Sequence, residues 1–291
     1  MKVLKGFALG LTGSFLFVAL IILGIAFTIN STVLSPKFLI SEIEKLDLSA
    51  TAQQILEERL PSEVKPYLPA INSTLDENKL WIKAQIDYSI NTLYNYLSGE
   101  SNILDLTFET QPLKQSLIKN LNQIYVQLPP SEQVITSDQF QQQLSDEIPS
   151  TIRVNRDNIP SEAWQTIQQA KEITGYNRTT YFALIFFSIL LILFIVLITR
   201  EVKGATLSLG IIFLVVGAGS LSALIATQRF VPGSIPMNDL PMQVKVWLKQ
   251  LIIDYLSPWK MYSIIILVLG VLLLVTGFFF RSKMAKQSEI G

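Results

Sequence analysis

The sequence TTYFALIFFSILLILFIVLIT (179–199) contains no Lys, Arg, Asp or Glu. A helix needs about 20 consecutive apolar residues to cross the hydrocarbon core of a bilayer. The stretch has this length and therefore predicts a transmembrane helix. The polar segment REVKG (200–204) follows, and then a second uncharged stretch, ATLSLGIIFLVVGAGSLSALIAT (205–227), which predicts a return crossing.

Two further uncharged stretches, 7–29 and 262–280, predict the first and fourth spans. The first is longer than the apolar core of a cleaved signal peptide and lacks an A-x-A site, so we interpret it as an uncleaved anchor. The four spans divide the chain into five segments: the N-terminal tail and span one (1–29), a large loop (30–178), spans two and three (179–227), a small loop (228–261), and span four with the C-terminal tail (262–291).

The distribution of cations predicts how the chain is threaded. Lys and Arg are dense in the two short tails and in the 200–204 turn, and sparse in the two much longer loops. Because Lys and Arg accumulate on the cytoplasmic side, we expect both termini in the cytoplasm and both loops outside. The large loop, 30–178, is long enough to bury a core of its own.

Composition excludes several kinds of chemistry. The chain has no Cys and no His, 23 Lys and Arg against 23 Asp and Glu, and a mean hydropathy of +0.40. Without Cys there are no disulfides, thiol nucleophiles or thiolate metal sites, and without His the commonest metal ligand is missing. We therefore expect no metal site and no cofactor. The two loops carry more carboxylates than cations and no basic run, which argues against nucleic-acid binding.

The large loop is predicted to be mostly helical with one pair of strands. Apolar residues repeat every three or four positions along 75–97, and alternate with polar residues along 103–109. We expect Thr74 and Ser137 as N-caps and Gly99 as a helix stop. The predicted helices are 35–46, 50–60, 75–97, 112–128, 138–148 and one from 161 into span two, with Gly175 as its weak point; the predicted strands, paired with each other, are 103–109 and 150–154.

The fold class expected is therefore mainly α: a four-helix membrane bundle with a large, mostly helical extracytoplasmic domain that carries a two-stranded β pair. The small loop adds an amphipathic helix over 242–256. This helix either packs against the large outer domain, which we favour, or lies in the membrane interface. Its apolar face and nearby aromatic residues form the candidate interfacial set: Trp247, Leu251, Tyr255, Trp259 and Tyr262.

Small residues recur within the spans. They allow helix backbones to approach closely in lipid, and the favoured interpretation is packing within the bundle. The alternative is contact with a second copy of the chain or with a partner's helix. The candidate helix-packing residues are Gly6, Gly10, Ser14, Gly217, Gly219, Gly270 and Gly277.

No pattern in the sequence predicts catalysis. The spans contain no Asp, Glu, Lys, Arg or His, which argues against a proton-coupled or ion-coupled carrier. The adjacent carboxylates Glu57-Glu58 and Asp146-Glu147 would project about 100° apart on a helix and are interpreted as solvated faces. No nucleophile elbow, Walker loop or dinucleotide fingerprint is present. We therefore expect a protein that is not an enzyme.

One large and one small outer loop on four spans resembles the layout of animal tetraspanins and claudins. Those families depend on cysteines in the outer loops, and this chain has none, so we carry no property over from them. A disulfide-free outer domain favours a bacterial or archaeal cell membrane. The expected function is to bind or organise other membrane or envelope proteins, including a second copy of the chain. The alternative is extracytoplasmic ligand capture for a partner that senses or transports.

Overall fold

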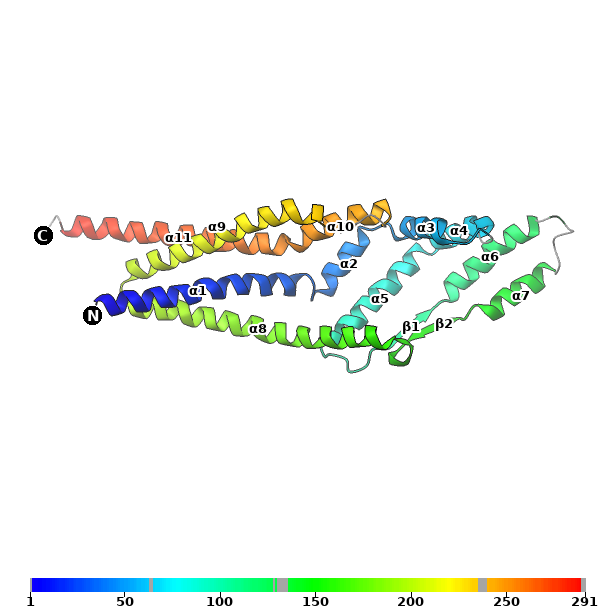
Figure 1. The fold of residues 1–291 in the computed structure, drawn as a ribbon, viewed down its shortest axis with the longest axis horizontal. Coiled ribbons are helices and arrows are strands. Elements are labelled where there is room, and N and C mark those ends of the chain that lie inside the picture. Colours follow the sequence, from blue (N-terminus) through cyan, green and yellow to red (C-terminus); the bar gives the residue numbers. More distant parts are fainter. Residues whose placement is uncertain (1, 63–64, 128, 130–135, 235–239, 289–291) are drawn as a thin grey trace. The chain divides into compact units, whose positions relative to one another are not determined.

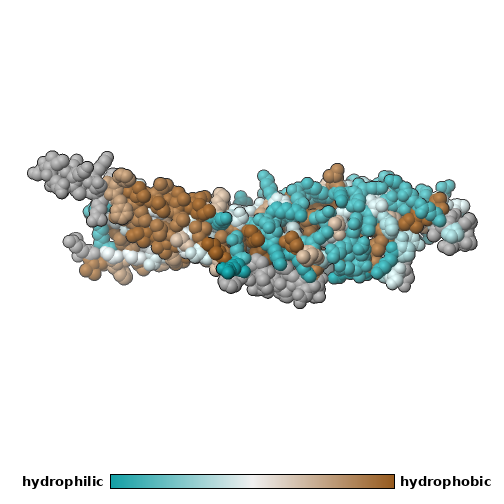
Figure 2. Space-filling model, turned by 90° about the horizontal axis from the view of Figure 1, so that it is seen from above, coloured by the Kyte–Doolittle hydropathy of each residue, from teal (hydrophilic) through white to brown (hydrophobic). Residues whose placement is uncertain are grey.

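The computed structural model describes residues 2–62, 65–127, 129, 136–234 and 240–288. Its internal contacts divide the chain into two compact units. One, here called the apolar unit, comprises Met1–Ser35, Thr174–Pro236 and Lys249–Gly291; the other, the polar unit, comprises Pro36–Ile173 and Met237–Leu248. Figure 2 shows the first with a mostly hydrophobic surface and the second with a mostly hydrophilic one.

Long helices dominate the apolar unit: α1 (Lys2–Ser31), α8 (Ser161–Thr199), α9 (Val202–Ser234) and α11 (Ser257–Ser288), of which α8 begins in the polar unit (Figure 1). In the described part of the chain, four helical segments are long and apolar enough to cross a membrane: Val3–Ser31, Ser161–Thr199, Val202–Arg229 and Met242–Phe279. The last of these combines α10 (Met242–Tyr255) with α11. The prediction of four apolar helices is confirmed.

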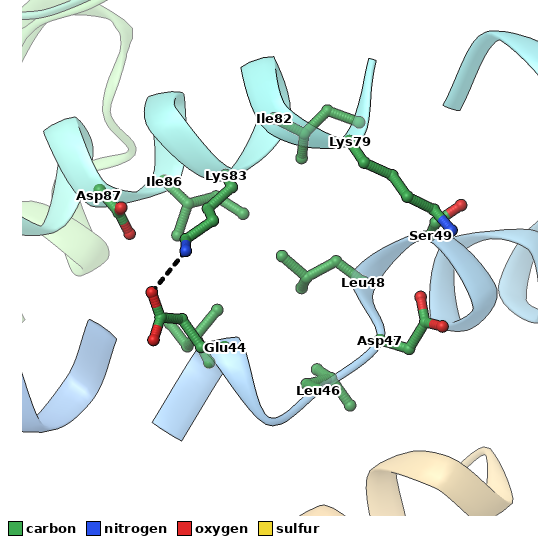
Figure 3. Close-up of a pocket in the computed structure, with 11 residues that line it drawn as sticks. Glu44, Leu46, Asp47, Leu48, Ser49, Lys79, Ile82, Lys83, Ile86 and Asp87 are labelled. Carbon is green, nitrogen blue, oxygen red and sulfur yellow. Dashed lines mark ion pairs between the residues drawn. The ribbon is translucent and has the colours of Figure 1, made fainter. Parts of the chain in front are cut away.

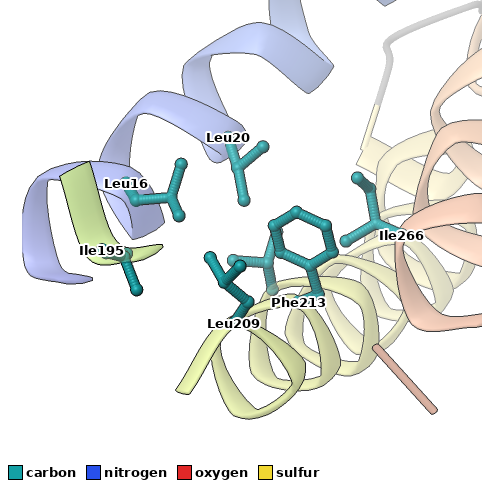
Figure 4. Close-up of a cluster of buried hydrophobic side chains, with 7 residues drawn as sticks. Leu16, Leu20, Ile195, Leu209, Phe213 and Ile266 are labelled. Atoms are coloured by element: carbon teal, nitrogen blue, oxygen red, sulfur yellow. The ribbon is translucent and has the colours of Figure 1, made fainter. Parts of the chain in front are cut away.

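A cluster of buried side chains from four helices forms the centre of the apolar unit (Figure 4). Leu16 of α1 and Ile195 of α8 are completely buried within it. Side chains on the outer sides of the same helices stay exposed, as at Phe186 and Leu197, because lipid tails are as apolar as the core. Helix packing, rather than escape from water, therefore decides which residues turn inward. The cluster consists of Leu16, Leu20, Ile195, Leu209, Phe213, Val216 and Ile266.

Helices α9 and α11 lie side by side and antiparallel, and they pack through glycines (Figure 1). The sequences LSLGIIFLVVG (207–217) and LVLGVLLLVTG (267–277) place Leu and Gly in the same order, Leu-x2-Gly-x3-Leu-x2-Gly. A Cβ atom on any of these glycines would lie 2.6 to 2.9 Å from an atom of the facing leucine, so a larger side chain would force the neighbouring helix or side chain to shift. Four pairs result: Gly210 with Leu274, Gly217 with Leu267, Gly270 with Leu214, and Gly277 with Leu207.

The turn between α8 and α9 is fixed at its start by a cation. The ammonium group of Lys5 donates a hydrogen bond to the carbonyl oxygen of Thr199, at 2.9 Å. The last carbonyls of a helix lack partners within the helix and form the negative end of its dipole. Arg200 then adopts a φ of 55°, the left-handed conformation that ends many helices. Helix α9 begins at Val202, directly after this turn.

Six helices and two strands build most of the described part of the polar unit. The helices are α2 (Pro36–Glu44), α3 (Leu48–Arg59), α4 (Leu68–Glu77), α5 (Lys79–Leu97), α6 (Gln111–Gln127) and α7 (Ser137–Glu147); the strands are β1 (Leu106–Glu109) and β2 (Thr151–Val154); 3₁₀ turns occupy Lys65–Tyr67 and Arg156–Asn158. The first half of α10 completes the unit.

The predicted strand pair is confirmed. Strands β1 and β2 are antiparallel, with Leu106 opposite Val154 and Glu109 opposite Thr151. A further backbone hydrogen bond, from Thr110 to the carbonyl of Ser150 at 2.9 Å, continues the ladder by one position. A lone strand would leave its backbone groups without partners, and this requirement pairs two segments that are separated in the chain by both α6 and α7.

The single helix predicted over 75–97 is wrong, because the chain forms two helices that meet at Asn78. Thr74 does not cap a helix. It lies inside α4, and its hydroxyl donates to the carbonyl of Ala70 at 2.8 Å. The Asn78 side chain donates to the carbonyl of Thr74 at 2.8 Å and competes with the backbone there. The unforeseen α4 has a proline in its first turn, where proline is tolerated.

Two further helix starts also differ from the prediction. Thr136, not Ser137, caps α7 and forms a reciprocal capping box with Gln139. Helix α3 begins at Leu48 rather than at position 50, because Asp47 accepts the backbone N–H of Ala50 at 3.0 Å. Gly99 ends α5 with a φ of 80°, as predicted. The predicted end of the 112–128 helix involves residues 128 and 130, which lie outside the described residues.

Helix α8 is continuous through Gly175, the predicted weak point. Its first turns are fixed to α5 by Tyr96, which is 3% exposed. The Tyr96 ring lies 5.8 Å from that of Trp164, and its hydroxyl accepts a hydrogen bond from Gln168. The ammonium of Lys171 lies 4.0 Å from the centre of the Tyr96 ring, a favourable cation–π distance.

Candidate functional site

A hollow of about 200 Å³ lies in the polar unit, between α5 and the corner that joins α2 to α3 (Figure 3). Its apolar lining consists of Ile43, Leu46, Leu48, Ile82 and Ile86. Its polar lining consists of Glu44, Asp47, Ser49, Lys79, Lys83 and Asp87. The hollow therefore combines an apolar interior with charges of both signs around it.

Helical spacing explains the α5 side of the hollow. Ile82 and Ile86 are four positions apart, and Lys79, Lys83 and Asp87 form a second row with the same spacing. Residues three or four apart share one face of a helix, so the two rows run next to each other along α5. One row supplies apolar surface and the other supplies charge.

The opposite side of the hollow is the corner between α2 and α3. Leu46 and Leu48 flank Asp47, and all three line the hollow. As the N-cap of α3, Asp47 accepts the backbone N–H of Ala50 at 3.0 Å, which satisfies one of the free donors in the first turn of the helix.

An ion pair joins the two sides. Lys83 of α5 and Glu44 of α2 are 2.6 Å apart, and each is about half exposed (Figure 3). The hydrogen bond and the charge of Glu44 raise the pKa of Lys83 above its ordinary value. Lys83 is therefore cationic at neutral pH, and its charge is already matched by a carboxylate.

A second carboxylate connects α3 to α4 and α5 beside the hollow. The hydroxyl of Ser49 donates to Asp76 at 2.6 Å, and Lys79 lies 3.1 Å from the same carboxylate oxygen. The bond from Ser49, followed by that from Lys79, lowers the pKa of Asp76. Asp76 therefore stays ionised and acts as a structural acceptor.

The contact between α4 and α6 repeats this arrangement. Glu77 accepts the hydroxyl of Ser116 at 2.6 Å and the ammonium of Lys119 at 3.1 Å, which lowers the pKa of Glu77. The buried Asn120 donates to the hydroxyl of Thr74 at 3.1 Å. A second hollow, of about 140 Å³, adjoins this contact and includes Asn120 in its lining. These polar groups satisfy one another and hold the two helices together.

The carboxylate pairs that the sequence offers as solvated faces, Glu57-Glu58 and Asp146-Glu147, lie at least partly exposed in the structure. Gln54 donates to Glu58 at 3.1 Å. Among the described residues, no three carboxylates gather closely enough to hold a metal ion.

The first half of α10 belongs to the polar unit and is joined to α2 and α3 by side chains. The indole N–H of Trp247 donates to the carbonyl of Glu42 at 2.7 Å, and Thr51 donates to Gln243 at 3.2 Å. Glu42 itself is 2% exposed. Its Oε1 lies 2.5 Å from Lys45, while its Oε2 has no hydrogen-bond partner among the described residues. This half of α10 therefore packs against the large loop, which is the alternative that we favoured from the sequence.

The other candidate interfacial residues lie in the apolar unit. Leu251, Tyr255 and Trp259 are half-buried, and their interfacial role stays a prediction. Tyr262 has a different environment. Its hydroxyl donates to the carbonyl of Leu20 at 2.6 Å, and its ring lies 6.1 Å from that of Phe27. These contacts give Tyr262 a packing role between α1 and α11.

The candidate helix-packing residues fall into two groups. Gly217, Gly270 and Gly277 lie at the α9–α11 contact, where a Cβ atom would collide. A Cβ atom on Gly6, Gly10 or Gly219 would meet nothing within 4 Å. Ser14 is exposed, and its hydroxyl donates a hydrogen bond to the Gly10 carbonyl. Contact of these four residues with another chain stays a prediction.

The two glycines with the closest unpredicted helix contacts are Gly24 and Gly210. A Cβ atom on Gly24 would lie 2.7 Å from the Tyr262 ring, and one on Gly210 would lie 2.9 Å from Leu274. The repeated Leu-x2-Gly-x3-Leu-x2-Gly pattern would have identified Gly210, because it occurs once in each of two spans. No comparable pattern marks Gly24.

Comparisons of the chain with protein-family models, with curated proteins and with solved structures find no match. The functional conclusion therefore depends on the geometry and charge of the chain itself.

Proposed function

We propose that this chain is a cell-membrane protein with four spans and both termini in the cytoplasm, and that the polar unit lies on the outer side. The accumulation of cations in the two tails and in the 200–204 turn supports this orientation. The two loops that form the polar unit then emerge on the same side of the membrane. The absence of cysteine from an outer domain of this size favours a bacterial or archaeal membrane.

Because the chain contains no native cysteine, single cysteines can test the orientation. We expect Ser98→Cys, at the exposed end of α5, to react with a membrane-impermeant maleimide on intact cells or spheroplasts. Glu201→Cys, in the exposed α8–α9 turn, should react only after permeabilisation. The reverse labelling pattern would contradict the proposed orientation.

In this proposal, the outer unit binds or organises protein partners and is not an enzyme. The observation that carries the proposal is the hollow in Figure 3, an apolar depression bordered by charges. Pockets of this composition accept the anchoring side chains of protein interfaces.

The size of the hollow favours a protein partner over a small ligand. Pockets for small molecules usually measure about 300–1,000 Å³, and this hollow measures about 200 Å³.

Native mass spectrometry of the full chain, extracted gently from its own membrane, tests the proposed function. We expect a discrete complex with other envelope proteins or with a second copy of the chain. A bare monomer that retains a small molecule would contradict the proposal and favour ligand capture.

A further inference from the structure

The volume of the hollow limits what can fill it. A cavity of about 150 Å³ lined by Leu, Ile and Phe holds one benzene molecule. A hollow of about 200 Å³ with five aliphatic side chains in its lining therefore accommodates one branched or aromatic side chain. It lies between α5 and the α2–α3 corner within one unit and is open to solvent, so a side chain can enter from outside.

The charges around the hollow are unequally satisfied. Lys83 is paired with Glu44, and Lys79 with Asp76. Asp87 also lines the hollow, four positions beyond Lys83 on α5, and forms no ion pair among the described residues. Its charge acts on Lys83 from a distance. Because three carboxylates, those of Glu44, Asp47 and Asp87, line the hollow with only two ammonium groups, the net charge of the lining is negative.

The polar unit as a whole also has a negative net charge. It contains 12 Lys and Arg against 20 Asp and Glu, a net charge of −8, whereas the apolar unit contains 11 against 3, a net charge of +8. A surface with a net charge attracts partners of the opposite charge and repels those of its own sign. The field around the hollow thus selects a cationic partner.

We propose that the hollow is the docking site for one apolar side chain of a partner protein, carried on a segment rich in Lys or Arg. The inference rests on the proposed function and adds the chemistry of the partner. The apolar side chain fills the space between Leu48 and Ile82, and a neighbouring cation pairs with Asp87. The combination follows the general pattern of a buried anchor surrounded by polar contacts.

The test uses the full chain in nanodiscs of a zwitterionic lipid and the dye-labelled peptide acetyl-KGKLGKGK-amide, with empty nanodiscs as background. Fluorescence anisotropy measures the dissociation constant. Replacing the leucine of the peptide by alanine removes three buried carbons and should weaken binding by about tenfold or more. Replacing its lysines by glutamate should abolish binding. Equal binding of the leucine and alanine peptides would overturn the proposal.

Variants of the chain locate the site. Ile82→Trp fills the hollow and should weaken binding about tenfold to hundredfold. Asp87→Asn leaves the lining intact and should weaken binding about twofold to fivefold. The matched control Asp105→Asn removes the same charge at an exposed position outside the lining and should bind as the unmodified chain does. Equal losses in Asp87→Asn and Asp105→Asn would indicate general attraction and overturn the assignment. Thermal unfolding shows whether the Ile82→Trp variant is folded. If that variant is unfolded, the binding of Asp87→Asn compared with Asp105→Asn tests the proposed site.

Native mass spectrometry of the same variants separates this inference from the proposed function. Loss of a stoichiometric partner in Ile82→Trp and its weakening in Asp87→Asn would support both. A partner that remains in both variants would support the organising function and overturn the role of the hollow. If the peptide binds at the hollow but native mass spectrometry finds no partner on the unmodified chain, the organising function alone is overturned.

Discussion

The glycine contact between α9 and α11 provides a sharp test of the membrane bundle. In Gly217→Ala, the new Cβ atom would lie 2.6 Å from the backbone nitrogen of Leu267, whereas ordinary contacts begin at 3.4 Å. The two helices would have to separate by about 1 Å, because the obstacle is backbone and cannot rotate away. Excess volume in a well-packed contact costs about 1–3 kcal/mol. We therefore expect Gly217→Ala to lower the free energy of unfolding by about this amount.

The matched control is Gly219→Ala, two positions further along the same helix. A Cβ atom there would meet nothing within 4 Å. Alanine is also a better helix former than glycine by about 0.5–1 kcal/mol, so this variant should be at least as stable as the unmodified chain. The assay is reversible unfolding of the full chain in mixed detergent and SDS micelles, followed by tryptophan fluorescence.

The facing position gives a second measurement. In Gly270→Ala, the Cβ atom would lie 2.6 Å from the backbone nitrogen of Leu214, and a similar loss is expected. Once one alanine has separated the helices, the second should cost less, so the double variant should lose less than the sum of the two. If Gly217→Ala and Gly219→Ala unfold at the same denaturant concentration, the close approach of α9 and α11 is refuted.

Two further predictions concern single polar contacts. Tyr262→Phe removes the hydrogen bond to the Leu20 carbonyl and should cost about 0.6 kcal/mol, and at most about 1.7, in the same micelle assay; Tyr176→Phe, at a residue that is 74% exposed, should cost nothing. The lowered pKa of Asp76 means that its ionised form stabilises the fold above the ordinary value of 3.8, and that this contribution is lost as the pH falls through the lowered value. The melting temperature should therefore fall between neutral and acid pH. The fall should be smaller in Asp76→Asn, which has already lost this carboxylate, than in Asp105→Asn. Equal dependence of the melting temperature on pH in the two variants would contradict the structural role of Asp76.

Local patterns predicted the features that depend on local physics. A run of about 20 uncharged apolar residues satisfies its backbone only as a helix in lipid, so the four spans could be read directly from the sequence. The switch from helical to alternating periodicity identified β1, and the need to pair its backbone pointed to β2. Gly99 ended α5 as expected, because glycine adopts a positive φ without steric cost.

Elements whose boundaries depend on distant contacts were predicted less well. Thr74 has the chemistry of a helix cap, yet it lies inside α4, where its hydroxyl accepts a hydrogen bond from Asn120 of α6. Tyr262 is an aromatic residue at the start of a span, where interfacial residues are expected. Gly24 of α1, however, leaves space for the Tyr262 ring inside the bundle. Neither contact is visible in the sequence near the residue concerned.

The sequence by itself determined that the chain has four segments able to span a membrane, where those segments lie, and how charge is divided along the chain, because hydropathy and charge are sums over residues. Only the tertiary structure decided that Ile82 and Ile86 face Leu46 and Leu48 across a hollow, and that Asp87 is a carboxylate left without an ion pair among the described residues there. Those properties depend on which residues, far apart in the chain, come within a few ångströms of each other, and no local pattern specifies that distance.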